Sequence, residues 1–196
     1  MTLFAGVRVL DLSRMLAGPY GSMLMADLGA EVIKIEEPDG GDPMRQMGPP
    51  FLPNGESAYF LAINRNKKSL ALDLTKPAGR EVFYDLVRIA DVVWDNFRPG
   101  IMAKLGCVPP RLSTLNPRLI CCSISAYGQE GPYRDWPAFD LALQAMGGAM
   151  SVTGEEEGAP VRMGLPMGDL AGGMFGAFAG AGALFRRERT GEGTFI

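Results

Sequence analysis

The chain has 196 residues, of which 47% are hydrophobic and 21% charged, and its 19 basic and 22 acidic residues give a formal net charge of −3. This composition is that of a folded globular protein, and the slight acidic excess argues against a basic surface for nucleic acid. The chain has no histidine, which excludes Ser-His-Asp triads, Cys-His dyads and histidine-ligated metals.

The first part of the sequence predicts a strand, a helix and a second strand. Residues 6–12 alternate apolar and polar side chains, residues 13–28 carry apolar side chains at helical spacing, and residues 31–36 again have a strand pattern. A βαβ unit of about 30 residues predicts parallel strands joined by a right-handed crossover. A loop rich in Gly and Pro follows over residues 38–54, and loops of this length are usually functional or pack against a partner.

The alternation of strands and helices continues in the middle of the sequence. Residues 69–74, 91–95 and 118–125 predict three further strands. Pro77 opens a helix through about residue 89, because proline is well tolerated in the first helical turn. This order predicts an α/β fold with an open, mostly parallel, Rossmann-like sheet.

The pattern changes after Tyr127. The following segments predict, in order, a loop, a helix, a hairpin and a final helix: 128–137, 140–150, 151–165 and 169–189.

The cysteines and the apolar segments predict a protein of the cytoplasm. Cys107, Cys121 and Cys122 lack C-x-x-C spacing, and the last two lie in an apolar run, which predicts buried, reduced thiols. Met1 leads directly into a strand-like segment, so we expect no secretory signal. The longest uncharged stretch, residues 170–185, is shorter than the roughly 20 residues of a membrane span.

The turn after the first strand is a candidate nucleotide site. It reads Ser13-Arg-Met-Leu-Ala-Gly-Pro-Tyr-Gly21, in place of the Gly-x-Gly-x-x-Gly pattern of dinucleotide-binding proteins, and Glu36 stands where a ribose-binding acid would be. A helix N-terminus with small residues can still bind a phosphate or a pantetheine arm through its amides. Tight packing of helix on strand explains the same small residues equally well.

Basic residues lie at the ends of two neighbouring predicted strands. Arg65, Lys67 and Lys68 precede one strand, and Arg98 and Lys104 follow the other. As a set they would suit the phosphates of a nucleotide-bearing ligand. Each residue taken alone is better explained as part of a solvated, charged rim.

Asp169 lies in the sequence Gly164-Leu-Pro-Met-Gly-Asp-Leu-Ala-Gly-Gly173, at the predicted start of the last helix. As an N-cap it would stabilise that helix by about 1 kcal/mol. As a nucleophile it would be ionised at neutral pH, open to a bulky electrophile because of the glycines, and independent of a histidine base. The lack of histidine adds weight to the second interpretation.

In a single register, several motifs of the sequence resemble those of a known family, the class III coenzyme A transferases (CaiB/BaiF family). The resemblance extends from about Val7 to Ile196. The matching motifs are Val9-Leu-Asp-Leu-Ser13, Ala17-Gly-Pro19, Leu28-Gly-Ala-Glu-Val-Ile-Lys-Ile-Glu36, Gly41-Asp-Pro43, Asn64-Arg-Asn-Lys-Lys-Ser69, Leu72-Asp73, Asp95-Asn-Phe-Arg-Pro-Gly100, Ser125-Ala-Tyr-Gly-Gln129, Gly131-Pro132, Gln144-Ala-Met-Gly-Gly148 and Gly168-Asp169.

The resemblance implies an enzyme that moves CoA from an acyl-CoA donor to a carboxylic acid acceptor. Asp169 would attack the thioester to form an acyl anhydride, CoA thiolate would return to give an aspartyl-CoA thioester, and the acceptor would then take over the CoA. CoA would be a substrate, with no tightly bound cofactor and no metal. The implied CoA contacts are Leu16, Ala17, Leu72, Thr75, Asn96, Phe97, Arg98 and Lys104, and the implied lining of the active site is the segment from Pro137 to Asp140, with Phe139 and Asp140.

Three positions depart from the patterns of this family. Glu37 and Pro137 stand where some members have a basic residue. The racemase branch uses a histidine paired with the aspartate, and its place falls at Phe139, which disfavours racemisation here. The alternatives are an acyl-CoA racemase or dehydratase-type enzyme, a non-catalytic CoA-binding fragment, and a dinucleotide-binding oxidoreductase, which the missing glycine pattern weakens.

The resemblance also implies a domain organisation. Residues 1–196 are expected to be the N-terminal portion of the large CoA-binding domain. The family's second, smaller domain and its C-terminal segment are expected to be absent from this chain, and the full-length form is expected to be an interlocked homodimer.

Overall fold

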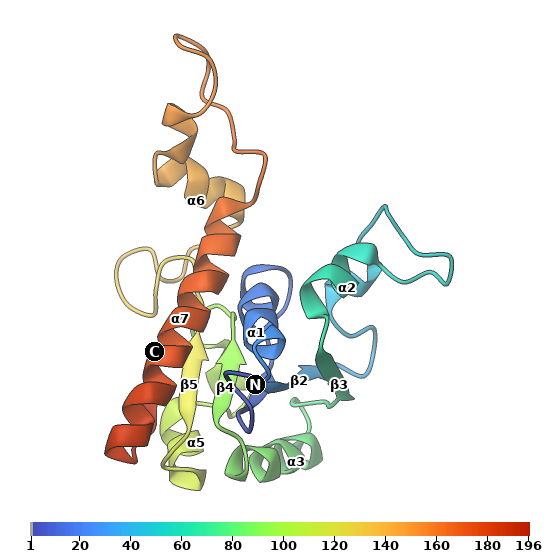
Figure 1. Ribbon diagram of the computed structural model, residues 1–196, viewed down its shortest axis with the longest axis vertical. Coiled ribbons are helices and arrows are strands. Elements are labelled where there is room, and N and C mark those ends of the chain that lie inside the picture. Colours follow the sequence, from blue (N-terminus) through green and yellow to red (C-terminus); the bar gives the residue numbers. More distant parts are fainter. Residues whose placement is uncertain (1) are drawn as a thin grey trace.

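The computed structural model describes residues 2–196 and is built on a six-stranded sheet with helices on both faces (Figure 1). Every neighbouring pair of strands is parallel, in the order β3-β2-β1-β4-β5-β6. The predicted α/β class and parallel sheet are confirmed. The strands are β1 (Arg8–Asp11), β2 (Glu31–Glu36), β3 (Lys67–Ala71), β4 (Val92–Asp95), β5 (Ile120–Ser123) and β6 (Thr194–Phe195).

The strand order reverses between β1 and β4. The chain adds β2 and β3 on one side of β1 and then returns to add β4, β5 and β6 on the other side. At such a switch point, the loops that leave the carboxyl ends of the two central strands diverge and open a crevice. The topology therefore places a candidate site at the carboxyl ends of β1 and β4.

Seven α-helices are described, and the longest, α7, packs along α1 on one face of the sheet, while α3 lies on the other (Figure 1). Three short helices were not predicted: α2 begins after Ser57, whose Oγ accepts a hydrogen bond from the Phe60 N–H at 3.2 Å, α4 follows Gly100, and α5 begins at Pro109. The helices are α1 (Ala17–Asp27), α2 (Ala58–Asn64), α3 (Pro77–Arg88), α4 (Ile101–Lys104), α5 (Pro109–Leu115), α6 (Asp140–Met146) and α7 (Met167–Thr190), with 3₁₀ turns at Pro43–Gln46 and Ala149–Val152.

The two faces of the sheet bury different side chains, as the alternation along the strands requires. Val9 and Trp94 pack toward α1 and α7, whereas Leu10 and Val93 pack toward α3 and α5. The three cysteines are free and buried, as predicted, and burial raises the pKa of each thiol to about 12. They are therefore unreactive core residues.

Helices α1 and α7 meet through glycines. A Cβ atom on Gly21 would lie 2.6 Å from the carbonyl oxygen of Gly173 and 2.6 Å from the Trp94 ring, closer than real Cβ contacts allow. The Trp94 Nε1–H donates to the Gly18 carbonyl at 2.9 Å, in the first turn of α1. This close approach places the beginning of α7 beside the loop that follows β1.

The hairpin predicted over residues 151–165 is wrong. The chain there forms the end of a 3₁₀ turn and then an irregular loop that extends away from the sheet beyond α6 (Figure 1). A hairpin needs one buried face, but Val152 and Val161 are both exposed. The preceding helix, α6, also ends earlier than predicted, because Gly147 and Gly148 follow Met146 and Gly148 has a φ of +80°.

None of the helices in residues 2–196 has the length and hydrophobicity that crossing a membrane requires.

Candidate active site

A cavity of about 450 Å³ opens at the carboxyl ends of β1 and β4, where the strand order reverses. Its walls come from the turn before α1, the loop around the 43–46 turn, α2, the segments after β4 and β5, and the first turns of α7. Seven of the residues proposed from the sequence line it: Leu16, Ala17, Asn96, Phe97, Arg98, Phe139 and Asp169.

Four other proposed residues lie outside this lining: Leu72, Thr75, Lys104 and Asp140. Leu72 packs partly against the core, the Thr75 Oγ1–H donates to Asp73 at 2.5 Å, and Lys104 ends α4 on the surface. Leu72 and Thr75 follow β3, and Lys104 follows β4, so they belong to the same edge of the sheet as the cavity.

Sequence reasoning missed several residues of the cavity wall. The length of the 38–54 loop pointed to a functional segment, but not to particular side chains in it. The additional lining residues include Met15, Met44, Met47, Tyr59, Arg134, Trp136 and Leu143.

Asp169 is not the N-cap of the last helix, which corrects that interpretation. Helix α7 begins at Met167, so Asp169 is its third residue. The cap comes instead from Asp140, the first residue of α6, whose Oδ1 accepts hydrogen bonds from the backbone N–H of Gly168 at 2.7 Å and of Asp169 at 3.2 Å. Within residues 2–196, no hydrogen bond to the Asp169 carboxylate is found, so its two oxygens have no protein partner.

Burial and charge both change the acidity of Asp169. Partial burial raises the pKa of its carboxyl to about 6, and the nearby charge of Asp140 adds to this shift. With that pKa the group is still about nine-tenths ionised at pH 7. Tyr59, on the cavity wall, has a pKa raised by burial and by the charges of Asp169 and Asp42. A carboxylate poorly solvated by water and without protein donors is a more reactive nucleophile than one at the surface.

Gln144 fixes Asp140 in its capping position. The buried Gln144 side chain donates through Nε2 to Asp140 Oδ2 at 2.6 Å and to the Leu165 carbonyl at 3.2 Å, and its Oε1 accepts from the Met163 N–H at 2.8 Å. These bonds join α6 to the segment that enters α7. The position of Asp169 therefore depends on Gln144, one helical turn after Asp140, through the hydrogen bonds that hold Asp140.

The turn after β1 is shaped by the buried carboxylate of Asp11. Asp11 accepts hydrogen bonds from the Ser13 N–H at 2.9 Å and the Ser22 Oγ–H at 2.6 Å, and it forms an ion pair with Lys67 at 3.0 Å. Burial opposes the ionisation of Asp11, but the charges of Lys67 and Lys34 and the hydrogen bonds from the Ser13 and Ser22 side chains together outweigh it. They lower the pKa of this carboxyl to about 2. Because the Ser13 N–H is hydrogen-bonded to the Asp11 carboxylate, the chain is not helical there. Helix α1 begins at Ala17, not at Ser13 as predicted.

Asn96 joins this turn to the end of β4. Its Oδ1 accepts from the Arg14 N–H at 2.8 Å, and its Nδ2 donates to the Arg14 carbonyl, also at 2.8 Å. Both polar groups of the Asn96 side chain thus hold the protein's own backbone. We conclude that Asn96 shapes the cavity wall.

The basic residues proposed to bind phosphate do not form one cluster. Arg65 pairs with Asp27 at 2.5 Å and Lys68 with Glu31 at 2.6 Å, whereas Lys67 is buried on Asp11. All three side chains form ion pairs within the fold, which favours the charged-rim interpretation for Arg65 and Lys68 and places Lys67 in the interior. The cations on the cavity wall are Arg98 and Arg134.

Glu36 is also engaged within the protein, which corrects its comparison with a ribose-binding acid. Its carboxylate accepts from Arg45 at 2.7 Å, from the Ser69 hydroxyl at 2.7 Å and from the Asp42 N–H at 3.0 Å. Burial alone would raise the pKa of Glu36, but these bonds and the charge of Arg45 together lower it to about 2. Across residues 2–196, no three carboxylate or thiol side chains are grouped so that they could hold a metal ion.

The chain is similar to known proteins over nearly its whole length. The chain is 47% identical over 191 residues to a mouse succinyl-CoA:glutarate CoA-transferase, a match that covers 97% of this chain and 44% of the relative. It is 45% identical over 194 residues to an acetyl-CoA:oxalate CoA-transferase of Acetobacter aceti, covering 98% and 49%. The crystal structure of a CAIB/BAIF family protein from Brucella suis superposes with a TM-score of 0.95 at 42% identity, covering all of this chain and 52% of that one.

The chain spans about half the length of the curated relatives it matches. A family model described as CoA-transferase family III matches residues 4–196. With this match over nearly its whole length, the chain belongs to CoA-transferase family III.

Proposed function

We propose that the protein containing this chain transfers CoA from an acyl-CoA to a carboxylic acid, with Asp169 as the nucleophile. The observation that carries the proposal is the free carboxylate of Asp169 on the wall of the switch-point cavity, with its backbone N–H held by Asp140. The two relatives described above are named for acceptors with two carboxyl groups, glutarate and oxalate. We therefore propose a dicarboxylic acid as the acceptor.

The reaction exchanges one anion for another at every step. Asp169 forms a C–O bond to the thioester carbonyl and CoA thiolate leaves, which produces a mixed anhydride. The thiolate attacks the aspartyl carbonyl and releases the donor acid as a carboxylate, leaving an aspartyl-CoA thioester. The acceptor carboxylate displaces the thiolate, which then attacks the acceptor acyl carbon and regenerates Asp169. No net proton moves, so a chain without histidine can carry out this chemistry.

The cavity wall suggests where the CoA would bind. Leu16 and Ala17 form the wall beside the first turn of α1, whose free amides favour an anionic group. On the neighbouring wall, Arg98 supplies a positive charge suited to phosphate. Phe139, 73% exposed, occupies the place of the racemase histidine, which favours transfer over racemisation.

The quaternary state and location also belong to this proposal. A homodimer is what the resemblance implies, and the cytoplasm is what the cysteines and apolar segments predict. Phe175 and Phe178 on α7 expose 70% and 78% of their surface. A dimer interface over this face would cover these apolar rings. Light scattering on the full-length protein tests the dimer.

The proposed nucleophile is tested in the full-length protein with the variant Asp169→Ala. Incubation with succinyl-CoA should give the unmodified protein a hydroxylamine-labile adduct and should give Asp169→Ala none, while CoA binding by calorimetry is preserved. Asp85→Ala, at a 77% exposed side chain on α3, is the matched control and should behave as the unmodified protein. Appreciable turnover by Asp169→Ala, or deuterium exchange at the substrate α-carbon without an acceptor acid, would contradict the proposal.

A further inference from the structure

A buried ion pair lies directly behind the cavity wall. Lys34 Nζ and Asp42 Oδ2 are 2.8 Å apart, and the two side chains are 3% and 0% exposed. Lys34 belongs to β2, whereas Asp42 belongs to the long loop that follows it, in the Gly41-Asp42-Pro43 sequence. Because the cost of desolvation largely offsets the attraction in such a pair, the pair by itself explains little of the stability of the fold. Its other contacts indicate a role in positioning.

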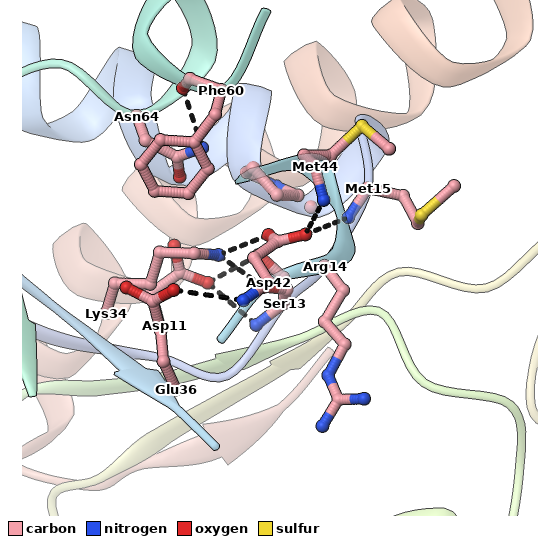
Figure 2. Close-up of polar contacts among 12 residues, drawn as sticks. Asp11, Ser13, Arg14, Met15, Lys34, Glu36, Asp42, Met44, Phe60 and Asn64 are labelled. Atoms are coloured by element: carbon pink, nitrogen blue, oxygen red, sulfur yellow. Dashed lines mark hydrogen bonds and ion pairs between the residues drawn. The ribbon is translucent and has the colours of Figure 1, made fainter. Parts of the chain in front are cut away.

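The pair contacts two segments that line the cavity, the turn before α1 and the 43–46 turn (Figure 2). Lys34 Nζ also donates to the Ser13 carbonyl at 2.7 Å, in the turn before α1. Asp42 Oδ1 accepts from the Met15 N–H of that turn at 3.4 Å and from the Met44 N–H of the 43–46 turn at 3.0 Å. Since Met15 and Met44 both line the cavity, one carboxylate oxygen joins the two walls.

One of these walls contains strained backbone. Met15 has a φ of +67°, in the left-handed region, which side chains other than glycine adopt only at a cost. Such a conformation persists only where the surrounding contacts impose it. Here the contacts on either side of Met15 are the Lys34 bond to Ser13, the Asn96 bonds to Arg14 and the Asp42 bond to Met15 itself.

We propose that the Lys34–Asp42 pair is a positioning device for acyl-CoA, which holds the turn over residues 13–17 in its strained shape and ties it to the 43–46 turn. This inference rests on the proposed function, because it takes the cavity to be the acyl-CoA site. Neither the Lys34 nor the Asp42 side chain lines the cavity, so neither would contact a substrate bound there. Both side chains act through the backbone of the 13–17 and 43–46 turns, which lines the cavity.

The test measures CoA affinity and turnover separately in the full-length protein. Asp42→Ala removes the pair and both amide contacts, so it should weaken CoA binding about tenfold or more, while kcat at saturating acyl-CoA changes less than about threefold. Asp42→Asn keeps an oxygen that can accept from the two amides, so its loss of affinity should be smaller. Asp42→Asn also provides the test of the proposal if Asp42→Ala does not fold.

A matched control separates positioning from general destabilisation. Arg187 and Asp91 form a second largely buried pair, 2.8 Å apart, with side chains 8% and 24% exposed, near the amino ends of the strands and away from the cavity. Arg187→Met should lower the melting temperature without changing CoA affinity. Equal losses of CoA affinity in Arg187→Met and Asp42→Ala would overturn the proposal.

A cycle with Met15→Gly tests the strained turn itself. Glycine adopts positive φ without cost, so in the Met15→Gly background the loss caused by Asp42→Ala should shrink at least threefold. Additive effects would refute the proposal. If the unmodified protein binds CoA and both Asp42 variants bind it equally well, the positioning role fails and the proposed function stands. If the unmodified protein does not bind CoA, the proposed function itself fails.

Discussion

The raised pKa of Asp169 predicts an acid limit on its reaction with acyl-CoA. Only the carboxylate attacks the thioester, and burial together with the charge of Asp140 raises the pKa of Asp169 to about 6. With that value the ionised fraction falls from about nine-tenths at pH 7 to about one-tenth at pH 5, whereas an ordinary aspartate would stay more than about nine-tenths ionised at pH 5. The rate of adduct formation should therefore fall roughly tenfold between pH 7 and pH 5.

The assay is single-turnover formation of the hydroxylamine-labile adduct, followed from pH 5 to pH 8 in the full-length protein. Asp140→Asn removes the neighbouring negative charge and should move the midpoint of the profile below about 6 but not to the ordinary value of about 4, because burial is the larger cause. A rate that does not change down to pH 5 would refute the reasoning about burial. A midpoint that does not fall in Asp140→Asn would refute the role of charge.

The same pKa shift affects the stability of the fold with the opposite pH dependence. Because the folded chain holds the Asp169 proton more tightly than the unfolded chain, this group contributes its stabilisation below about pH 4 and loses it as the pH rises through about 6. The free energy of unfolding of Asp169→Asn, measured by urea denaturation across this pH range, should lack this pH-dependent contribution.

Three further substitutions test the packing behind the site. Gly21→Ala places a Cβ atom against the carbonyl of Gly173 and should lower the free energy of unfolding by about 1–3 kcal/mol in urea titrations; an unchanged midpoint would contradict the close helix contact. Lys67→Met leaves the buried charge of Asp11 without its ion-pair partner and should lower the free energy of unfolding by about 3–5 kcal/mol, measured in the same way. Gln144→Leu removes the three hydrogen bonds described above, so adduct formation should slow more than CoA binding weakens, and equal effects on both would argue against its role at α7.

Much of the fold could be predicted from the sequence, because strand and helix periods are local properties. The alternation in residues 6–12 and 31–36 predicted β1 and β2, and the apolar run around Cys121 predicted a buried strand. The same method was wrong for residues 151–165, where alternation occurs without a face to bury. The short helix α2 was missed, because a single capping serine is a weak signal.

The candidate site was only partly predictable, because its geometry depends on contacts between distant segments. The glycine-rich sequence around Asp169 marked it as a candidate nucleophile, and the lack of histidine in the chain added weight to that interpretation. That Asp140 would cap α7 and leave Asp169 free was not visible, since the two residues belong to different helices. Lys67 likewise looked like a surface cation until the fold placed it on Asp11.

The sequence by itself determined the α/β class, the burial of the cysteines and the lack of histidine in this chain, because these follow from composition and from the spacing of neighbouring residues. The tertiary structure decided which charged side chains pair within the fold, that Asp140 of α6 caps the start of α7, and that the strained turn at Met15 faces the cavity. Those outcomes depend on which side chains meet across the sheet and between the helices. Only the folded chain brings Lys34, Asp42 and Met15 together behind one wall of the site.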